Sequence, residues 1–161
     1  MFKILIPDEN HDTINDVDLS SLRKKGLNNI LIDVDNTIVP WNSDKVSSNL
    51  RTWIKKSQDT GFELYLFSNN SHSRIKKLAD ILKISAIPKG GKPLTFAFRR
   101  ALKYIDGSPE DTVMIGDQVF TDIWGGNLVG LYTILVNPIS SKEFWGTKFN
   151  RFLEKLLAIR R

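Results

Sequence analysis

Apolar residues along this chain fall into two alternating patterns. Short continuous apolar runs are typical of strands buried on both faces of a parallel sheet, and strands are predicted at 28–33, 62–68, 85–87, 112–115 and 132–136. Between these runs apolar residues recur every three or four positions, which predicts helices at 43–60, 71–83, 93–105 and 121–128. Strands that alternate with helices through right-handed crossovers predict an α/β fold: a single-domain, doubly wound three-layer sandwich with a central parallel sheet.

Capping residues set the expected helix ends. Ser43 is predicted to cap the first helix and Gly61 to end it, while Pro93 is expected in the first turn of the third helix. An amphipathic helix is predicted at 149–159, within a basic segment at about 142–161.

Composition narrows the class of protein. A chain of 161 residues is expected to form one domain. It has no cysteine, which excludes a disulfide framework, a thiolate metal site and a cysteine nucleophile. No apolar run approaches the ~20 residues that cross a bilayer, and the N-terminal apolar stretch is too short for a signal peptide. We therefore expect a cytoplasmic protein with no transmembrane segment.

Positive charge is concentrated at the C-terminal end. The net charge is +5, and residues 142–161 hold six basic and two acidic side chains, so this segment contributes +4 and the rest of the chain +1. Two interpretations of the segment stay open. Its apolar stripe could pack on the sheet, or its basic residues could meet an anionic membrane surface, as a peripheral protein at the inner face of the membrane would do.

Polar residues follow three of the predicted strands where each strand ends. Asp33, Asp35 and Thr37 follow the first run, Ser68-Asn69-Asn70 ends the second, and Gly116-Asp117 ends the fourth, with Asp122 close behind. In open α/β sheets, ligands bind beyond the carboxyl ends of the strands. These three strand ends are therefore expected to meet in one crevice.

The chemistry of that crevice follows from its charges. Clustered carboxylates from Asp33, Asp35 and Asp117 would repel one another unless a cation neutralised them. Oxygen ligands with open positions suit Mg²⁺, which also takes phosphate oxygens from a substrate. A carboxylate beside Mg²⁺ can attack phosphorus. Ser68 could then hydrogen-bond the phosphoryl oxygens, and Lys92 could offset their charge.

The motifs in order now support a resemblance. The series D-x-D-x-T, S-N-N, K-P and G-D-x-x-x-x-D resembles the haloacid-dehalogenase (HAD) superfamily of phosphatases. The segments 33–41 (DVDNTIVPW) and 116–122 (GDQVFTD) resemble the YqeG-like branch of its subclass IIIA, which is similar to phosphatidylglycerophosphate phosphatases. Asp-x-Asp by itself usually marks a solvated turn, so the complete set of four motifs carries the resemblance.

The resemblance implies a role for each matching residue. Asp33 would be the nucleophile and a Mg²⁺ ligand. Asp35 would bind Mg²⁺ through its backbone carbonyl, while its side chain protonates the leaving group and later activates water. Asp117 would complete the Mg²⁺ site.

Further residues would hold the substrate or support the site. Ser68, Asn69 and Lys92 would bind the phosphoryl group, with Lys89 a weaker rival of Lys92 because only Lys92 precedes proline. Thr37 would support the metal site, and Asp122 would orient Lys92 or a metal-bound water.

The spacing of the motifs bears on the substrate. Only about thirty residues separate Asp35 from Ser68, and fewer separate Ser68 from Lys92, so neither gap can hold the cap domain that many of these phosphatases carry. An open site suits a phosphate displayed on a large or membrane substrate. The basic tail and the resemblance make phosphatidylglycerophosphate, and hence phospholipid metabolism, the leading candidate.

Two alternatives remain. One is a soluble phosphatase that acts on a small phosphorylated metabolite or a phosphoprotein. The other is a non-catalytic binding or scaffold module with a basic face, which the complete set of charged motif residues disfavours, because clustered carboxylates without a cation destabilise a fold. Nucleic acid is a disfavoured partner because basic and aromatic residues do not interleave. The sequence makes no prediction of the oligomeric state.

Overall fold

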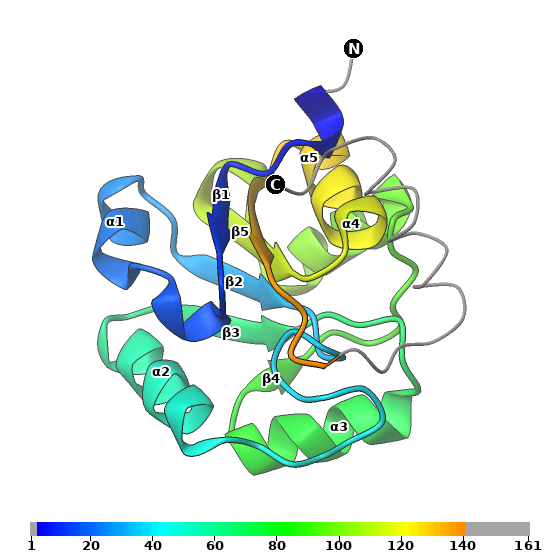
Figure 1. The fold of residues 1–161 in the computed structure, drawn as a ribbon. Helices are drawn as coiled ribbons and strands as arrows, with labels where there is room; N and C mark the ends of the chain where they lie inside the picture. The colour runs from blue at the N-terminus through cyan, green and yellow to red at the C-terminus, as the bar shows by residue number, and fades with distance from the viewer. Residues whose placement is uncertain (1–2, 141–161) are drawn as a thin grey trace.

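One parallel sheet organises the chain (Figure 1). The computed structural model describes residues 3–140, and their strands form a six-stranded sheet in the order β1-β6-β5-β2-β3-β4. Every neighbouring pair is parallel. The strands are β1 (Glu9–His11), β2 (Asn29–Ile32), β3 (Glu63–Leu66), β4 (Ser85–Ala86), β5 (Thr112–Gly116) and β6 (Tyr132–Val136).

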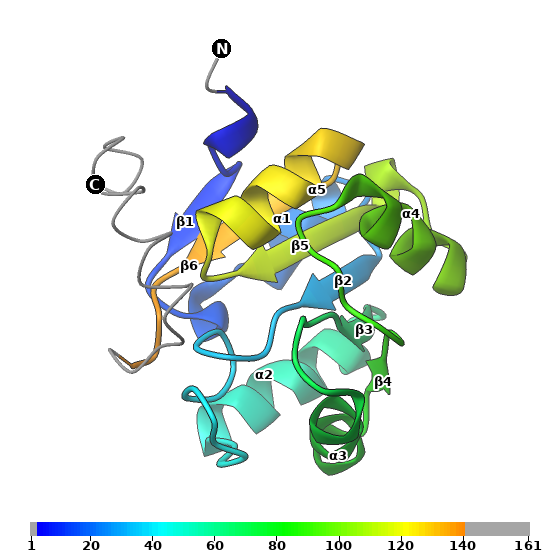
Figure 2. The same ribbon diagram turned by 90° about the vertical axis from the view of Figure 1, so that its right-hand side faces the viewer.

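Helices cover both faces of the sheet. They are α1 (Leu19–Lys24), α2 (Ser48–Asp59), α3 (His72–Leu82), α4 (Thr95–Tyr104) and α5 (Trp124–Val129). Figure 2 shows α2 and α3 on one side of the sheet and α4 and α5 on the other. Short 3₁₀ turns lie at Lys3–Leu5, Ile14–Asp16 and Pro109–Asp111, and a π-helical turn, Val119–Ile123, leads directly into α5.

The core is divided between these two faces. Ile30 and Ile32 of β2 belong to the cluster that includes the apolar sides of α1, α2 and α3. Leu31, between them, belongs to the cluster with α4. Because successive side chains of a strand point to opposite faces, a strand that is apolar at every position needs helices packed on both faces of the sheet. The predicted three-layer α/β fold is confirmed.

Most predicted elements are present, with shifted ends. The predicted strands agree with β2 to β6 within two residues at each end. The first predicted helix begins five residues too early, because the residue that caps α2 is Ser47, whose hydroxyl accepts a hydrogen bond from the Leu50 amide at 3.2 Å. Ser43 instead lies in a turn, where its amide donates to the Pro40 carbonyl.

Two further boundaries differ from the prediction. Helix α4 begins at Thr95 with Leu94 at its N-cap, so Pro93 lies outside the helix. The predicted helix 121–128 is a π-helical turn followed by the short α5. The predicted helix at 149–159 lies outside the described residues.

The N-terminal elements were not predicted, since their sequences give little signal. Strand β1 contains only Glu9, Asn10 and His11, yet it extends the sheet beside β6. Helix α1 spans six residues, which is too short for a clear period, and it begins at Asp18, whose side chain accepts from the Ser20 amide.

The connections leave the carboxyl end of the sheet open. Between β2 and β3 the chain forms a loop and α2, and between β3 and β4 it forms α3. Within residues 3–140 neither connection carries a cap domain. No helix among these residues has the length and apolar character needed to cross a membrane.

Candidate active site

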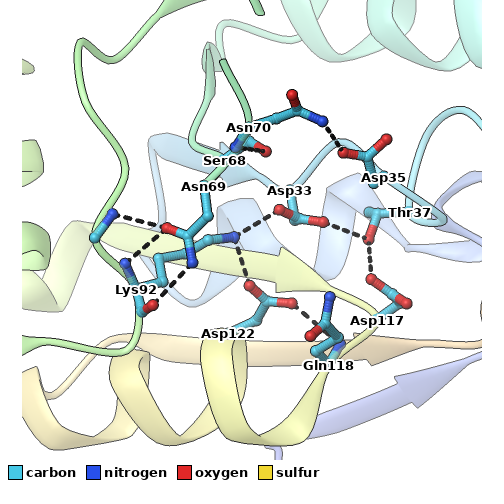
Figure 3. Close-up of polar contacts among 11 residues, drawn as sticks. Asp33, Asp35, Thr37, Ser68, Asn69, Asn70, Lys92, Asp117, Gln118 and Asp122 are labelled. Carbon is cyan, nitrogen blue, oxygen red and sulfur yellow. Dashed lines mark hydrogen bonds and ion pairs between the residues drawn. The ribbon is translucent and has the colours of Figure 1, made fainter. Parts of the chain in front are cut away.

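The polar strand ends lie side by side because β5, β2 and β3 are neighbours in the sheet. Asp117 directly follows β5, Asp33 directly follows β2, and Ser68 follows β3 after one residue. In parallel strands these ends share one edge, so side chains separated by more than eighty residues in the sequence converge there (Figure 3).

Three carboxylates form the centre of the site. Asp33, Asp117 and Asp122 each offer an oxygen atom, and these atoms lie within 4.8 Å of one another. All three residues are buried, with Asp117 and Asp122 fully inaccessible. A cluster of carboxylate oxygens with this spacing is a donor set that suits a divalent cation such as Mg²⁺.

Lys92 is the cation of this cluster. Its ammonium group donates to Asp33 Oδ1 at 2.7 Å and to Asp122 Oδ1 at 2.6 Å, and its side chain is 2% exposed. Burial alone would lower the pKa of Lys92, but the adjacent carboxylates of Asp122 and Asp33 outweigh it and raise the pKa of the lysine. Lys89, by contrast, is exposed.

The charges do not balance without a metal ion. Three carboxylates and one ammonium sum to −2, the charge that one divalent cation neutralises. The pKa of Asp33 is raised from 3.8 to about 6. Burial is the main cause, the charge of Lys92 opposes the shift, and repulsion by Asp122 adds to it. The residues present therefore fit the divalent ion expected from the sequence.

Thr37 connects the first motif to Asp117 of the fourth motif. Its hydroxyl lies 3.0 Å from Asp117 Oδ1 and 3.5 Å from Asp33 Oδ2, and the residue is buried. The segment reaches this position through a tight turn in which Asn36 adopts a left-handed conformation with φ of 63°. A hydroxyl has one proton to donate, so Asp117 is the partner that the shorter distance favours.

The side chain of Asn69 contacts the loop that carries Lys92. Its Oδ1 accepts from the amides of Gly91 and Lys92 at 2.7 and 2.9 Å, and its Nδ2 donates to the Lys92 carbonyl at 2.8 Å. Asn69 therefore fixes the backbone from which Lys92 reaches into the site. Its Nδ2 group has a second proton to donate, and binding of phosphate by Asn69 stays a prediction.

The loop before Lys92 packs tightly on Ser68. A Cβ added at Gly90 would lie 2.4 Å from the Ser68 carbonyl oxygen, so only glycine allows this approach. Arg100 of α4 donates to the carbonyls of Lys89 and Gly90 from the other side. Ser68 Oγ accepts from the Asn70 amide at 3.2 Å, which leaves the hydroxyl proton available for a phosphoryl oxygen.

The turn after β5 brings Asp122 back under the strand end. Asp122 Oδ2 accepts from the Gln118 amide at 3.1 Å while Oδ1 faces Lys92. A Cβ added at Gly116 would lie 2.2 Å from Asp122 Oδ2. The glycine of the G-D motif is therefore required for the carboxylate to fit beneath it.

Asp35 lies apart from the three-carboxylate cluster. Asn70 Nδ2 donates to its Oδ2 at 2.7 Å, and Arg74 Nη1 contacts its Oδ1 at 2.6 Å. Asn70 belongs to the S-N-N motif of the sequence, but Arg74 was not predicted. Arg74 carries one signal that could have found it: a positive charge in the first turn of a helix opposes the helix dipole, which indicates an acidic partner nearby.

The architecture is shared with known structures. YfnB from Bacillus subtilis, which is assigned as a HAD hydrolase and was determined with bound magnesium, superposes with a TM-score of 0.54 at 16% identity, covering 81% of this chain and 98% of that one. At this identity the likeness shows the fold alone.

Sequence comparisons identify the family. The HAD-hydrolase-like family model matches residues 90–139. "Probable phosphatase YqeG" of Bacillus subtilis (strain 168) is 36% identical over 153 residues, covering 95% of this chain and 89% of that protein. "Phosphatidylglycerophosphate phosphatase 1, chloroplastic/mitochondrial" of Arabidopsis thaliana is 27% identical over 136 residues, and the match spans 79% of this chain but 39% of that longer protein. The chain therefore belongs to the HAD superfamily, among its YqeG-like phosphatases.

Proposed function

We propose that this HAD-type phosphatase is a Mg²⁺-dependent phosphate monoesterase in which Asp33 is the nucleophile. The observation that carries the proposal is the buried cluster of Asp33, Asp117 and Asp122 around Lys92, whose charge of −2 matches one divalent cation. A bound Mg²⁺ would be held by Asp33 and Asp117 with the Asp35 backbone carbonyl, and it would neutralise the carboxylates and the phosphoryl oxygens.

The proposed reaction has two steps, formation of an aspartyl-phosphate on Asp33 and its hydrolysis. Asp33 attacks phosphorus, its new oxygen–phosphorus bond forms, and the ester bond to the leaving group breaks. Asp35 gives a proton to the leaving oxygen. In the second step water attacks the aspartyl-phosphate, Asp35 takes a proton from that water, and phosphate and free Asp33 result. Ser68 and Lys92 bind the phosphoryl oxygens, with Asn69 holding the Lys92 backbone in place.

The proposed substrate is a phosphate carried on a large or membrane-embedded molecule, with phosphatidylglycerophosphate the leading candidate. The open carboxyl end of the sheet supports this proposal, as does the similarity to the Arabidopsis phosphatidylglycerophosphate phosphatase. We place the enzyme in the cytoplasm, peripheral to the inner face of the membrane.

Exposed apolar side chains next to the site add support. Trp41 and Ile139 flank Asn36, because the Trp41 amide donates to Asn36 Oδ1 and the Ile139 amide to the Asn36 carbonyl. They are 39% and 48% exposed. Leu94 and Phe96 follow Lys92 and are 54% and 59% exposed. Large exposed apolar side chains grouped around a site are typical of contact with a lipid or protein surface.

Vesicle assays test the substrate. Phosphate release from vesicles that contain phosphatidylglycerophosphate should require Mg²⁺ and disappear in Asp33→Asn. Exchanging Leu94 and Phe96 for serine should lower activity on vesicles but not on a soluble aryl phosphate, since these side chains lie outside the reacting cluster. A wild type that releases phosphate from soluble metabolites or phosphoproteins, and none from vesicles, would refute the lipid assignment. Hydrolysis of the aryl phosphate that survives Asp33→Asn would refute the mechanism.

A further inference from the structure

The carboxylate of Asp35 is held by two side chains from the segment after β3. Each of its oxygens has one donor: Asn70 Nδ2 lies 2.7 Å from Oδ2, and Arg74 Nη1 lies 2.6 Å from Oδ1. Asp35 follows β2 and both donors follow β3, so the contacts join two separate strand ends. Figure 3 shows Asn70 and Asp35 facing each other above the three-carboxylate cluster.

Arg74 also holds the chain that leads away from Asp35. Its Nη2 donates to the Ser43 carbonyl at 2.8 Å, and its Nε lies 3.4 Å from Asp44 Oδ1. The Arg74 side chain is only 13% exposed, so this guanidinium is largely enclosed by its partners. It therefore connects helix α3 to both ends of the loop between Asp35 and Asp44.

The contacts of Arg74 use the shape of a guanidinium. Three different nitrogen atoms, fixed in one plane, reach three separate acceptors, whereas the three donors of an ammonium group share a single nitrogen atom. Its place in the first turn of α3 gives it no support from the helix dipole. The interactions that favour this side chain are those with Asp35, Ser43 and Asp44.

We propose that Arg74, together with Asn70, is a positioning residue that fixes the Asp35 carboxyl group where it exchanges protons with the leaving group and with water. The inference rests on the proposed phosphatase mechanism. Arg74 acts through Asp35 and does not itself bind the phosphoryl group. It keeps its own proton in both steps: Asp35 gives a proton to the leaving alcohol in the first step and gains one from the attacking water in the second.

The size of the effect follows from the geometry that proton transfer needs. A carboxyl group must lie within hydrogen-bond reach of the oxygen it protonates, and a displacement of about 1 Å in a catalytic group can lower a rate by about a hundredfold. Without its two donors the Asp35 side chain would be free to rotate about its own bonds.

The leaving group distinguishes this role from a structural one. An alkyl alcohol is a poor leaving group and depends strongly on protonation, whereas p-nitrophenolate leaves without a proton. Arg74→Lys and Asn70→Ala should therefore lower kcat/KM for an alkyl phosphate by about tenfold or more. Their kcat/KM for p-nitrophenyl phosphate should fall several-fold less, since kcat/KM reports formation of the aspartyl-phosphate and not its hydrolysis, the step that still needs Asp35 for this substrate. The alkyl phosphate used in this test is whichever substrate of the preceding assays, lipid or metabolite, the wild-type protein hydrolyses.

Lys77→Ala is the matched control. Lys77 also lies on α3 and binds Asp44 at 2.6 Å, but it is 63% exposed and its ion pair is with Asp44 and not with Asp35. It should leave both activities near wild type. Asp35→Asn provides the reference, because it should show the same dependence on the leaving group in a stronger form.

Several outcomes would overturn the inference. Equal losses on the two substrates in Arg74→Lys, or no loss on either, would show that Arg74 does not act through Asp35. If Lys77→Ala showed the same difference between the two substrates as Arg74→Lys, the cause would be the contact with Asp44 that both side chains share, and not the contact of Arg74 with Asp35. If Arg74→Lys fails to fold, Asn70→Ala carries the test alone, since it removes one of the two donors. A wild type inactive on both substrates would instead refute the proposed function.

Discussion

Exchanging Asp33, the proposed nucleophile, for its uncharged isostere is expected to stabilise the metal-free protein. Asp33→Asn removes one negative charge from a buried cluster whose net charge is −2. Lys92 keeps its contact with Asp122 at 2.6 Å, and an amide oxygen can still accept a hydrogen bond from the ammonium group. The exchange therefore relieves repulsion without leaving the buried lysine unpaired.

The pKa of Asp33 sets the magnitude. Burial raises it from 3.8 to about 6 in the folded protein. The folded state then binds more protons than the unfolded state between these two values, so the free energy of unfolding falls as the pH rises through this window. At pH 7 the ionised side chain lowers that free energy by about 3 kcal/mol, because one pKa unit corresponds to about 1.4 kcal/mol. We expect Asp33→Asn to recover about 2–3 kcal/mol of it, or about 5–10 °C in Tm for a chain of this length.

Urea unfolding at pH 7 in the presence of EDTA measures the difference. The advantage of Asp33→Asn should shrink when Mg²⁺ is added, since a ligand stabilises the protein that binds it. Asp35→Asn is the matched control, because Asp35 lies outside the cluster and pairs with Arg74. It should lose activity without gaining stability. If Asp33→Asn is less stable than wild type in EDTA, attraction by Lys92 dominates at Asp33 and this reasoning is refuted.

Three further predictions concern the same cluster. Calorimetry should show that wild type binds Mg²⁺ about tenfold more weakly at pH 5 than at pH 8, because Asp33, with a pKa of about 6, must lose its proton to bind the ion. A Mg²⁺ affinity that did not change with pH would contradict the role of Asp33 as a ligand. Gly116→Ala should lower both Tm and kcat, since its Cβ would meet Asp122 at 2.2 Å, and a variant equal to wild type in both would contradict the packing. Asn69→Ala should lower kcat about tenfold by releasing the Lys92 backbone, with little change in Mg²⁺ affinity; a selective loss of Mg²⁺ affinity would contradict its role.

The fold could be predicted because its signals are local. An uninterrupted apolar run such as that of β2 and the helical spacing around α3 each report burial within a few residues. Strand β1 could not be predicted, because its three polar residues join the sheet through backbone hydrogen bonds to β6. Ser43 and Ser47 are equally good capping residues by type, and tertiary contacts decide that Ser47 caps α2.

The site could be predicted only in part, for a related reason. Asp33, Ser68 and Asp117 follow strands, and parallel strands bring their carboxyl ends to one edge without any further information. The partners of their neighbours depend on loop paths. Asn69 contacts a backbone segment more than twenty residues away in the sequence. Asp35, which follows β2, contacts helix α3, which follows β3. Local patterns carry no record of such contacts.

The two aspartates of the first motif are close in sequence but differ in their surroundings. Asp33 is buried among carboxylates, and within residues 3–140 the cation that contacts it is Lys92. Asp35 is partly exposed and meets one arginine and one amide. Two carboxyl groups with such different surroundings are suited to different tasks. If Asp35 joined the cluster, the charge would become −3 and one divalent ion could not neutralise it. In the proposed mechanism, Arg74 holds Asp35 outside the cluster, so that one motif supplies both the metal-binding nucleophile and a separate group for proton transfer.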